Sequence, residues 1–94
     1  MYRVEVTAYR KVVDRIDLSI DFMKMFSGYK CILSSGSMKS GRDIIRCDRA
    51  TIMCDEDKID ELICIKNRIE SILYEDAIAA GLLPTDYYAK ITVS

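Results

Sequence analysis

The sequence predicts an α+β fold: a small single-domain antiparallel sheet with two helices on one face. Two observations lead to this fold class. Apolar and polar residues alternate with a strand-like period at both ends of the chain, and a long amphipathic helix lies between them over residues 58–80. Ninety-four residues support one hydrophobic core, so we expect one domain over residues 1–94. The order of the predicted elements is compatible with a ferredoxin-like arrangement.

The first 27 residues contain neither Gly nor Pro. Over residues 2–9 apolar side chains alternate with charged or polar ones, and this period predicts a strand. From residue 9 to residue 26 apolar side chains recur at helical spacing, which favours a helix. A second strand over residues 15–22 is the alternative, because apolar and polar residues also alternate there.

The middle of the chain carries most of its turn-forming residues. Gly28 suits the end of a helix, and a short strand over residues 29–34 would follow it. Residues 35–41 are rich in Ser and Gly, so we predict a loop there. Asp43 is a candidate cap for a helix that begins at the end of this loop.

A second interpretation of the middle region stays open. Residues 44–54 can pair as a strand, and the acidic residues at 55–57 would then open the long helix, where its dipole favours negative charge. The long helix would end at Gly81, and residues 87–93 alternate as a closing strand after Pro84.

An all-α helical hairpin that forms a dimer is the alternative fold. Residues 42–80 contain no Gly and no Pro, so they can be drawn as one continuous helix. Isoleucines at seven-residue steps, Ile45, Ile52 and Ile59, support this drawing.

Composition excludes several classes of chemistry. The chain has no His, which removes the usual general base and the commonest metal ligand. The four cysteines, Cys31, Cys47, Cys54 and Cys64, show no metal or redox spacing, and we interpret them as small buried hydrophobes. We therefore expect no enzyme, no metal and no cofactor. No apolar run is long enough to cross a bilayer, and we expect a cytoplasmic protein.

The densest positive feature is a candidate site for phosphate or nucleic acid. It consists of Lys39, Arg42, Arg46 and Arg49, just after the Ser- and Gly-rich segment. In a helix, the three arginines would share one face. The interleaved Asp43 and Asp48 give a simpler explanation, which is ion pairing on a solvated surface.

A protein interface is the other candidate site. The apolar arc of the long helix is wide enough to meet both the sheet and a partner, and small domains often self-associate, so we expect a homodimer. Acidic residues and tyrosines add contact chemistry. The candidate interface residues are Asp55, Glu56, Asp57, Ile65, Lys66, Glu70, Ile72, Tyr87 and Tyr88.

These features support two hypotheses of function. The first is a non-enzymatic protein that binds another protein as an inhibitor or adaptor. A concrete example of that class is a phage or mobile-element anti-defence protein, of the kind that inhibits CRISPR systems. The second is a protein that binds nucleic acid or a nucleotide phosphate through the basic segment 39–49.

Overall fold

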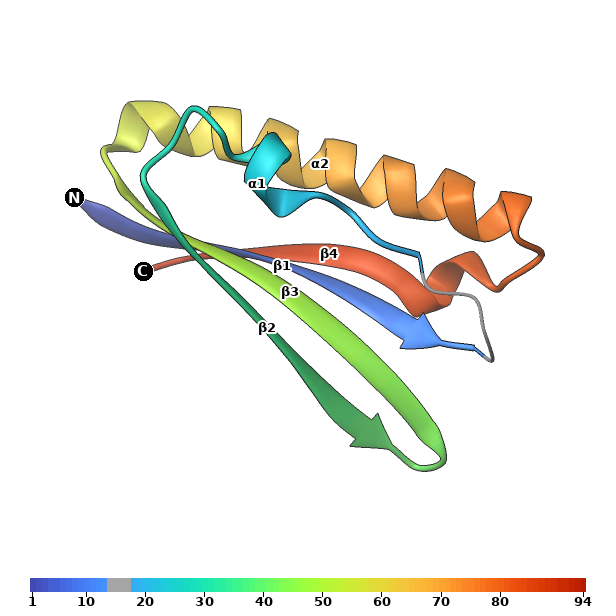
Figure 1. Cartoon of the computed structure of the whole chain (residues 1–94). Coiled ribbons are helices and arrows are strands. Elements are labelled where there is room, and N and C mark those ends of the chain that lie inside the picture. Colours follow the sequence, from blue (N-terminus) through green and yellow to red (C-terminus); the bar gives the residue numbers. More distant parts are fainter. Residues whose placement is uncertain (14–17) are drawn as a thin grey trace.

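Two layers make up the chain, a sheet and a pair of helices that lie on the same face of it (Figure 1). The computed structural model describes residues 1–13 and 18–94. Its elements in chain order are β1 (Tyr2–Val12), α1 (Phe22–Met25), β2 (Cys31–Ser40), β3 (Asp43–Cys54), α2 (Glu56–Ala79), the 3-10 turn η1 (Pro84–Asp86) and β4 (Tyr87–Val93).

The sheet has the strand order β2-β3-β1-β4, and every neighbouring pair is antiparallel. This confirms the predicted α+β fold, and the all-α hairpin is wrong. The succession strand, helix, strand, strand, helix, strand together with this strand order is the ferredoxin-like arrangement, with α1 reduced to one turn. Two strands, β1 and β3, are internal, whereas β2 and β4 are the edges.

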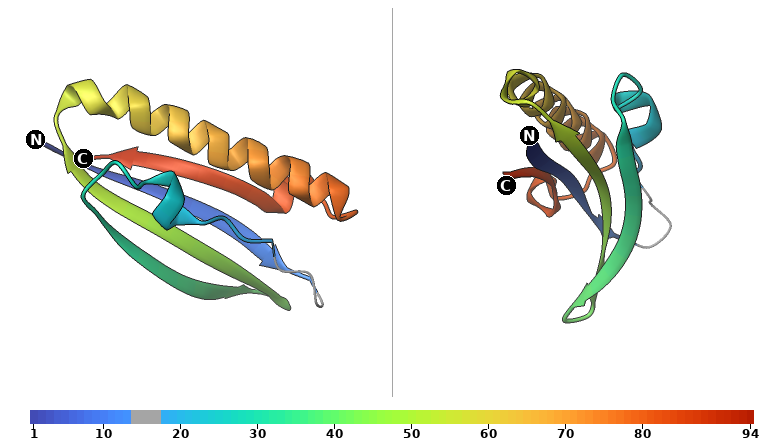
Figure 2. Two further views of the ribbon diagram at one scale, coloured as in Figure 1. Left: turned by 45° about the horizontal axis from the view of Figure 1, so that its top comes forward. Right: turned by 90° about the vertical axis from the view of Figure 1, so that its left-hand side faces the viewer.

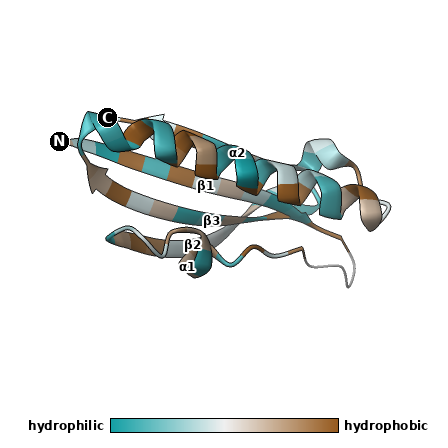
Figure 3. Cartoon of the chain, turned by 90° about the horizontal axis from the view of Figure 1, so that it is seen from above, coloured by the Kyte–Doolittle hydropathy of each residue, from teal (hydrophilic) through white to brown (hydrophobic). Residues whose placement is uncertain are grey.

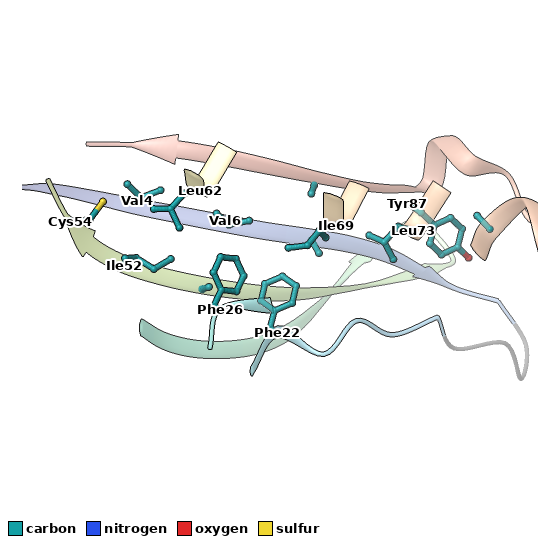
Figure 4. Packing of buried hydrophobic residues seen from close by; sticks show 14 residues of the cluster. Val4, Val6, Phe22, Phe26, Ile52, Cys54, Leu62, Ile69, Leu73 and Tyr87 are labelled. Atoms are coloured by element: carbon teal, nitrogen blue, oxygen red, sulfur yellow. The ribbon is translucent and has the colours of Figure 1, made fainter. Parts of the chain in front are cut away.

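Hydrophobic and hydrophilic residues alternate along β1 (Figure 3), and this alternation decides which side of the sheet is buried. Val4, Val6 and Ala8 are almost fully buried beneath α2, whereas the residues between them point to the opposite face. From α2, Leu62, Ile69 and Leu73 face the sheet at helical spacing (Figure 4). Ala77, one turn further along the helix, is also buried. This interdigitation is the core of the domain.

The two ends of α2 differ in how they are stabilised. At the N-cap, the side chain of Asp55 makes no capping hydrogen bond. Glu56 and Asp57 lie in its first turn, where the helix dipole favours acidic residues. At the other end Gly81 has a φ of 74°, and the N–H groups of Gly81 and Leu82 donate to the carbonyls of Ile78 and Ala77 at 3.1 and 2.8 Å. This pair of bonds is a Schellman motif, so Gly81 stops the helix as the sequence predicts.

The predicted helix over residues 9–26 is wrong. Strand β1 continues to Val12, because it pairs with β3 along its whole length. The only helix that the structure describes in this range is α1, one turn capped by Asp21, whose side chain accepts from the backbone N–H of Lys24 at 3.2 Å. Residues 14–17 lie outside the described residues, and residues 18–21 form no strand.

The α1 region still completes the core. Phe22 and Phe26 are buried beside α2, with ring centroids 5.4 Å apart, and they cover β3 (Figure 4). The buried guanidinium of Arg10 on β1 donates to the carbonyl of Leu18 and, at 2.9 Å, to Oδ2 of Asp48. These charge-assisted bonds hold the segment that enters α1 against the sheet.

The predicted loop over residues 35–41 is also wrong, since β2 extends to Ser40 and pairs regularly with β3. Only Gly41 and Arg42 form the turn, and Gly41 has a φ of 65°, as the primed hairpin turns require. Asp43 therefore begins a strand and caps no helix. The tip of this hairpin points away from both helices (Figures 1 and 2).

Among the described residues, no helix has the length and apolar character needed to cross a membrane.

Phe26 gives a direct test of this packing. We expect Phe26→Ala to lower the free energy of unfolding by about 3–5 kcal/mol, because it removes a buried ring and leaves a cavity. Met23→Ala on the same turn is the matched control, since Met23 is exposed and its change should cost less than about 0.5 kcal/mol. Urea denaturation measures both values, and equal losses would contradict the placement of α1 over the core.

Candidate functional site on the open face of the sheet

The two faces of the sheet differ sharply in what covers them. Both helices lie on one face, and no described element covers the other, which we call the open face (Figure 2). The strand registers determine which side chains point toward the open face. They are those of the odd-numbered residues on β1 and β3 and of the even-numbered residues on β2 and β4.

An apolar hollow lies on the open face where β2 and β3 meet the start of β1. It has a volume of about 810 Å³. Met1, Ile32 and Met53 are its large apolar side chains, and they are 83, 73 and 55% exposed. The residues that line the hollow are Met1, Arg3, Lys30, Cys31, Ile32, Thr51 and Met53. Exposed apolar surface with a cationic rim of this kind is characteristic of an interaction site.

A charged network occupies the centre of the open face. Arg49 lies 3.7 Å from a carboxylate oxygen of Glu5, and its Nε donates to Oγ1 of Thr7 at 3.2 Å. Arg3 pairs with the same carboxylate at 3.0 Å. Glu5 therefore lies between two guanidinium groups and offsets much of their charge.

A stacked pair of tyrosines lies on the same face, further along β1. The rings of Tyr9 and Tyr88 have centroids 4.9 Å apart and an interplanar angle of 22°. The ammonium of Lys90 lies 5.7 Å from the centroid of Tyr88, within the range of a cation–π contact. Because Tyr88 was predicted at a protein interface, its place on the open face keeps that prediction open.

The structure divides the predicted basic cluster. Arg46 and Arg49 are three residues apart on a strand, so they point to opposite faces of the sheet. Lys39 shares the helix-side face with Arg46, and Arg42 lies in the hairpin turn. The arginines would share one face only in a helix, and because this segment is a strand that condition is not met.

The predicted interface residues on α2 fall into three groups. Asp55, Glu56 and Asp57 are exposed at the start of the helix. Ile65 and Ile72 are half-buried on its flanks. Lys66 and Glu70 form an ion pair of 3.1 Å, as expected for residues four apart, and a carboxylate oxygen of Glu70 accepts from the backbone N–H of Ala89 on β4 at 3.4 Å.

Tyr87 belongs to the core and offers no contact surface. It is 2% exposed, and its hydroxyl donates to the carbonyl of Lys11 at 2.8 Å. Its prediction as an interface residue is wrong, because the alternation of β4 points Tyr87 toward α2 and Tyr88 toward the open face.

The cysteines are all free thiols, but they differ in burial. Cys54 is buried, Cys31 and Cys47 are half-buried, and Cys64 is exposed on α2, where a buried residue was expected. Burial raises the pKa of the Cys47 thiol. Among the described residues, no group of cysteines and carboxylates is arranged to hold a metal ion.

Sequence reasoning missed the hollow. Met1, Ile32 and Met53 come from three separate segments, and only the strand order brings them together. A signal for Met53 was present, because it alternates with the buried Ile52 and Cys54. Comparison of the chain with models of protein families, with curated proteins and with solved structures finds no significant match.

Next to the hollow, a hydrogen bond from Tyr29 connects the segment before β2 to α2. Its hydroxyl donates to a carboxylate oxygen of Glu61 at 2.7 Å. This hydrogen bond, with burial and the charge of Glu61, raises the pKa of Tyr29 to about 12. The neutral phenol is thus favoured in the folded chain.

We expect Tyr29 to titrate at about pH 12 in the folded protein, against about 10 in the unfolded chain. Because the folded-state pKa is raised, this contribution to stability is complete below pH 10 and is lost as the pH rises toward 12. NMR titration of tyrosine ring carbons measures the shift, and Glu61→Gln should return the pKa of Tyr29 toward its ordinary value. The raised pKa of Tyr87, caused mainly by burial, should not respond. An unchanged Tyr29 pKa in Glu61→Gln would contradict the bond.

Proposed function

We propose that this chain is a non-enzymatic protein that binds another protein, as an inhibitor or adaptor, through the open face of its sheet. The apolar hollow around Met53 is the observation that supports this proposal. Contact of apolar side chains with water is unfavourable, and a partner that covers them lowers the free energy of the system. Methionines suit such a surface, because their flexible thioether chains adapt to the shape of the partner.

Charge narrows the chemistry of the partner. Lys30 and Arg3 stand at the rim of the hollow, and no carboxylate is among the described residues that line it. Glu5 offsets part of the charge of Arg3, so Lys30 is the main source of positive charge at this rim. An apolar segment flanked by acidic residues fits this arrangement, because opposite charges at the rim direct the encounter while the apolar centre supplies affinity.

Nucleic acid is the second candidate, and one observation favours it. Tyr9, Tyr88 and Lys90 put aromatic rings beside a cation on the open face, which is the chemistry used to stack bases. Against it, the two rings already stack on each other, and Glu5 lies between the nearby arginines Arg3 and Arg49. Protein binding therefore remains the better supported function.

Met53→Asp tests the proposal. We expect the tagged wild-type chain to capture a protein in stoichiometric amount from a lysate of its source cells, after nuclease treatment. Met53→Asp should reduce this capture about tenfold or more, because a charge replaces an apolar anchor at the centre of the contact. Quantitative mass spectrometry of the captured proteins gives the ratio.

Met23→Asp is the matched control. It makes the same substitution at a methionine that is 75% exposed on α1, on the helix side of the sheet. We expect it to capture the partner as wild type does, and urea denaturation of both variants checks their folding. The proposal fails if the two variants behave alike. It also fails if capture yields only nucleic acid, whose binding would weaken steeply with salt.

A further inference from the structure

The two edge strands of the sheet are protected to different degrees. On β4, Glu70 of α2 accepts a hydrogen bond from the outward N–H of Ala89, so the helix covers part of this edge. Over the described residues, no such bond to the outer backbone of β2 is found, and the side chains of this strand are almost all exposed. An exposed strand edge is a template for pairing with another strand.

The hydrogen-bond pattern identifies the groups at this edge. Arg3 and Ser94 exchange two backbone bonds of 2.9 Å, so the odd-numbered residues of β1 bond to β4 and the even-numbered ones to β3. Following the registers, the odd-numbered residues of β3 bond to the even-numbered residues of β2. The residues of β2 whose N–H and C=O groups point outward are therefore Cys31, Leu33, Ser35, Ser37 and Lys39.

The sequence of β2 does not block pairing. It contains no Pro, its register with β3 shows no bulge, and none of its residues from Cys31 to Met38 carries a charge. The two lysines nearest this stretch, Lys30 and Lys39, stand at its ends. Edge strands that must remain unpaired usually carry a proline, a bulge or a charged side chain near their middle.

We propose that β2 pairs edge to edge with β2 of a second copy of this chain, antiparallel about a two-fold axis, with Ser35 opposite the partner's Ser35. In this register every outward residue of β2 meets an outward residue of its partner. Leu33 faces the partner's Ser37, and Cys31 faces the partner's Lys39. The two sheets then become one continuous sheet of eight strands.

Self-complementarity favours a second copy over an unrelated strand. On the open face this register sets Ile32, 73% exposed, opposite the partner's Met38, which is 47% exposed. No two like charges meet, because Lys39 faces the partner's Cys31. A shift of two residues in either direction leaves an outward residue at one end of β2 without a strand partner, so this register forms the most backbone pairs.

This pairing shares only Cys31 and Ile32 with the hollow of the proposed function, and it differs from the dimer predicted through α2. The four buried residues of α2 face the sheet, whereas no hydrogen bond from the described residues reaches the outer backbone of β2. Met53 lies on the internal strand β3, so Met53→Asp should leave the dimer intact. Failure of one proposal can therefore be recognised without the other.

Charge complementation tests the register. Ser35→Lys and Ser35→Glu each bring two like charges together at the two-fold axis, so we expect each to raise the dimer dissociation constant about tenfold or more in sedimentation experiments. An equal mixture of the two variants should dimerise as wild type does, because opposite charges then meet. Thr92→Lys and Thr92→Glu, exposed changes on the opposite edge strand, are the matched controls.

Substitution of Ser35 also removes its hydrogen bond to Asp48, so a Ser35 variant that folds poorly would not test the dimer. Amide hydrogen exchange in the wild-type protein provides a second test. In wild-type protein the amides of Leu33, Ser35 and Ser37 should become protected as concentration rises. Ser37→Pro, which removes only an outward N–H, should abolish the dimer while the β2–β3 hairpin stays intact. A wild-type chain that stays monomeric overturns the proposal. So does a dimer that is unaffected by the Ser35 and Ser37 changes, or a β2 edge that pairs only with a different protein.

Discussion

Burial of one face of β1 beneath α2 is the contact on which the rest of the structure depends. Val4, Val6 and Ala8 all belong to the same buried cluster as Leu62, Ile69 and Leu73. Strand β1, which carries them, lies inside the sheet with β3 and β4 on either side. No element that the structure describes packs on the opposite face. The open face and both strand edges are thus consequences of how the single core is built.

The sequence predicted those elements that have one buried and one exposed side. These are the start of β1, most of α2, and β4, and in each of them apolar residues recur with a clear period. Strand β2 is exposed on both faces, which removes the period, and its Ser and Gly residues therefore suggested a loop. The helix over residues 9–26 failed because pairing with β3 outweighed helical spacing up to Val12.

The candidate site was less predictable, because it depends on the order of the strands. Tyr88 was identified from its residue type, but Tyr9 joins it only because β1 and β4 are neighbours. Ile32 and Met53 become neighbours through the β2–β3 register, which no local pattern specifies. The shared face of the arginines depended on local structure, since a spacing of three residues puts Arg46 and Arg49 together on a helix and separates them on a strand.

The distribution of charge links the two surfaces of the molecule. Between Glu56 and Ala79, α2 carries seven acidic and three basic residues, whereas the rim of the hollow carries Arg3 and Lys30. The acidic layer and the cationic rim thus lie on opposite sides of the sheet. A partner with acidic flanks would be repelled from the helices and attracted to the open face. Edge pairing through β2 would preserve this separation, because it extends both layers side by side and leaves each open face uncovered.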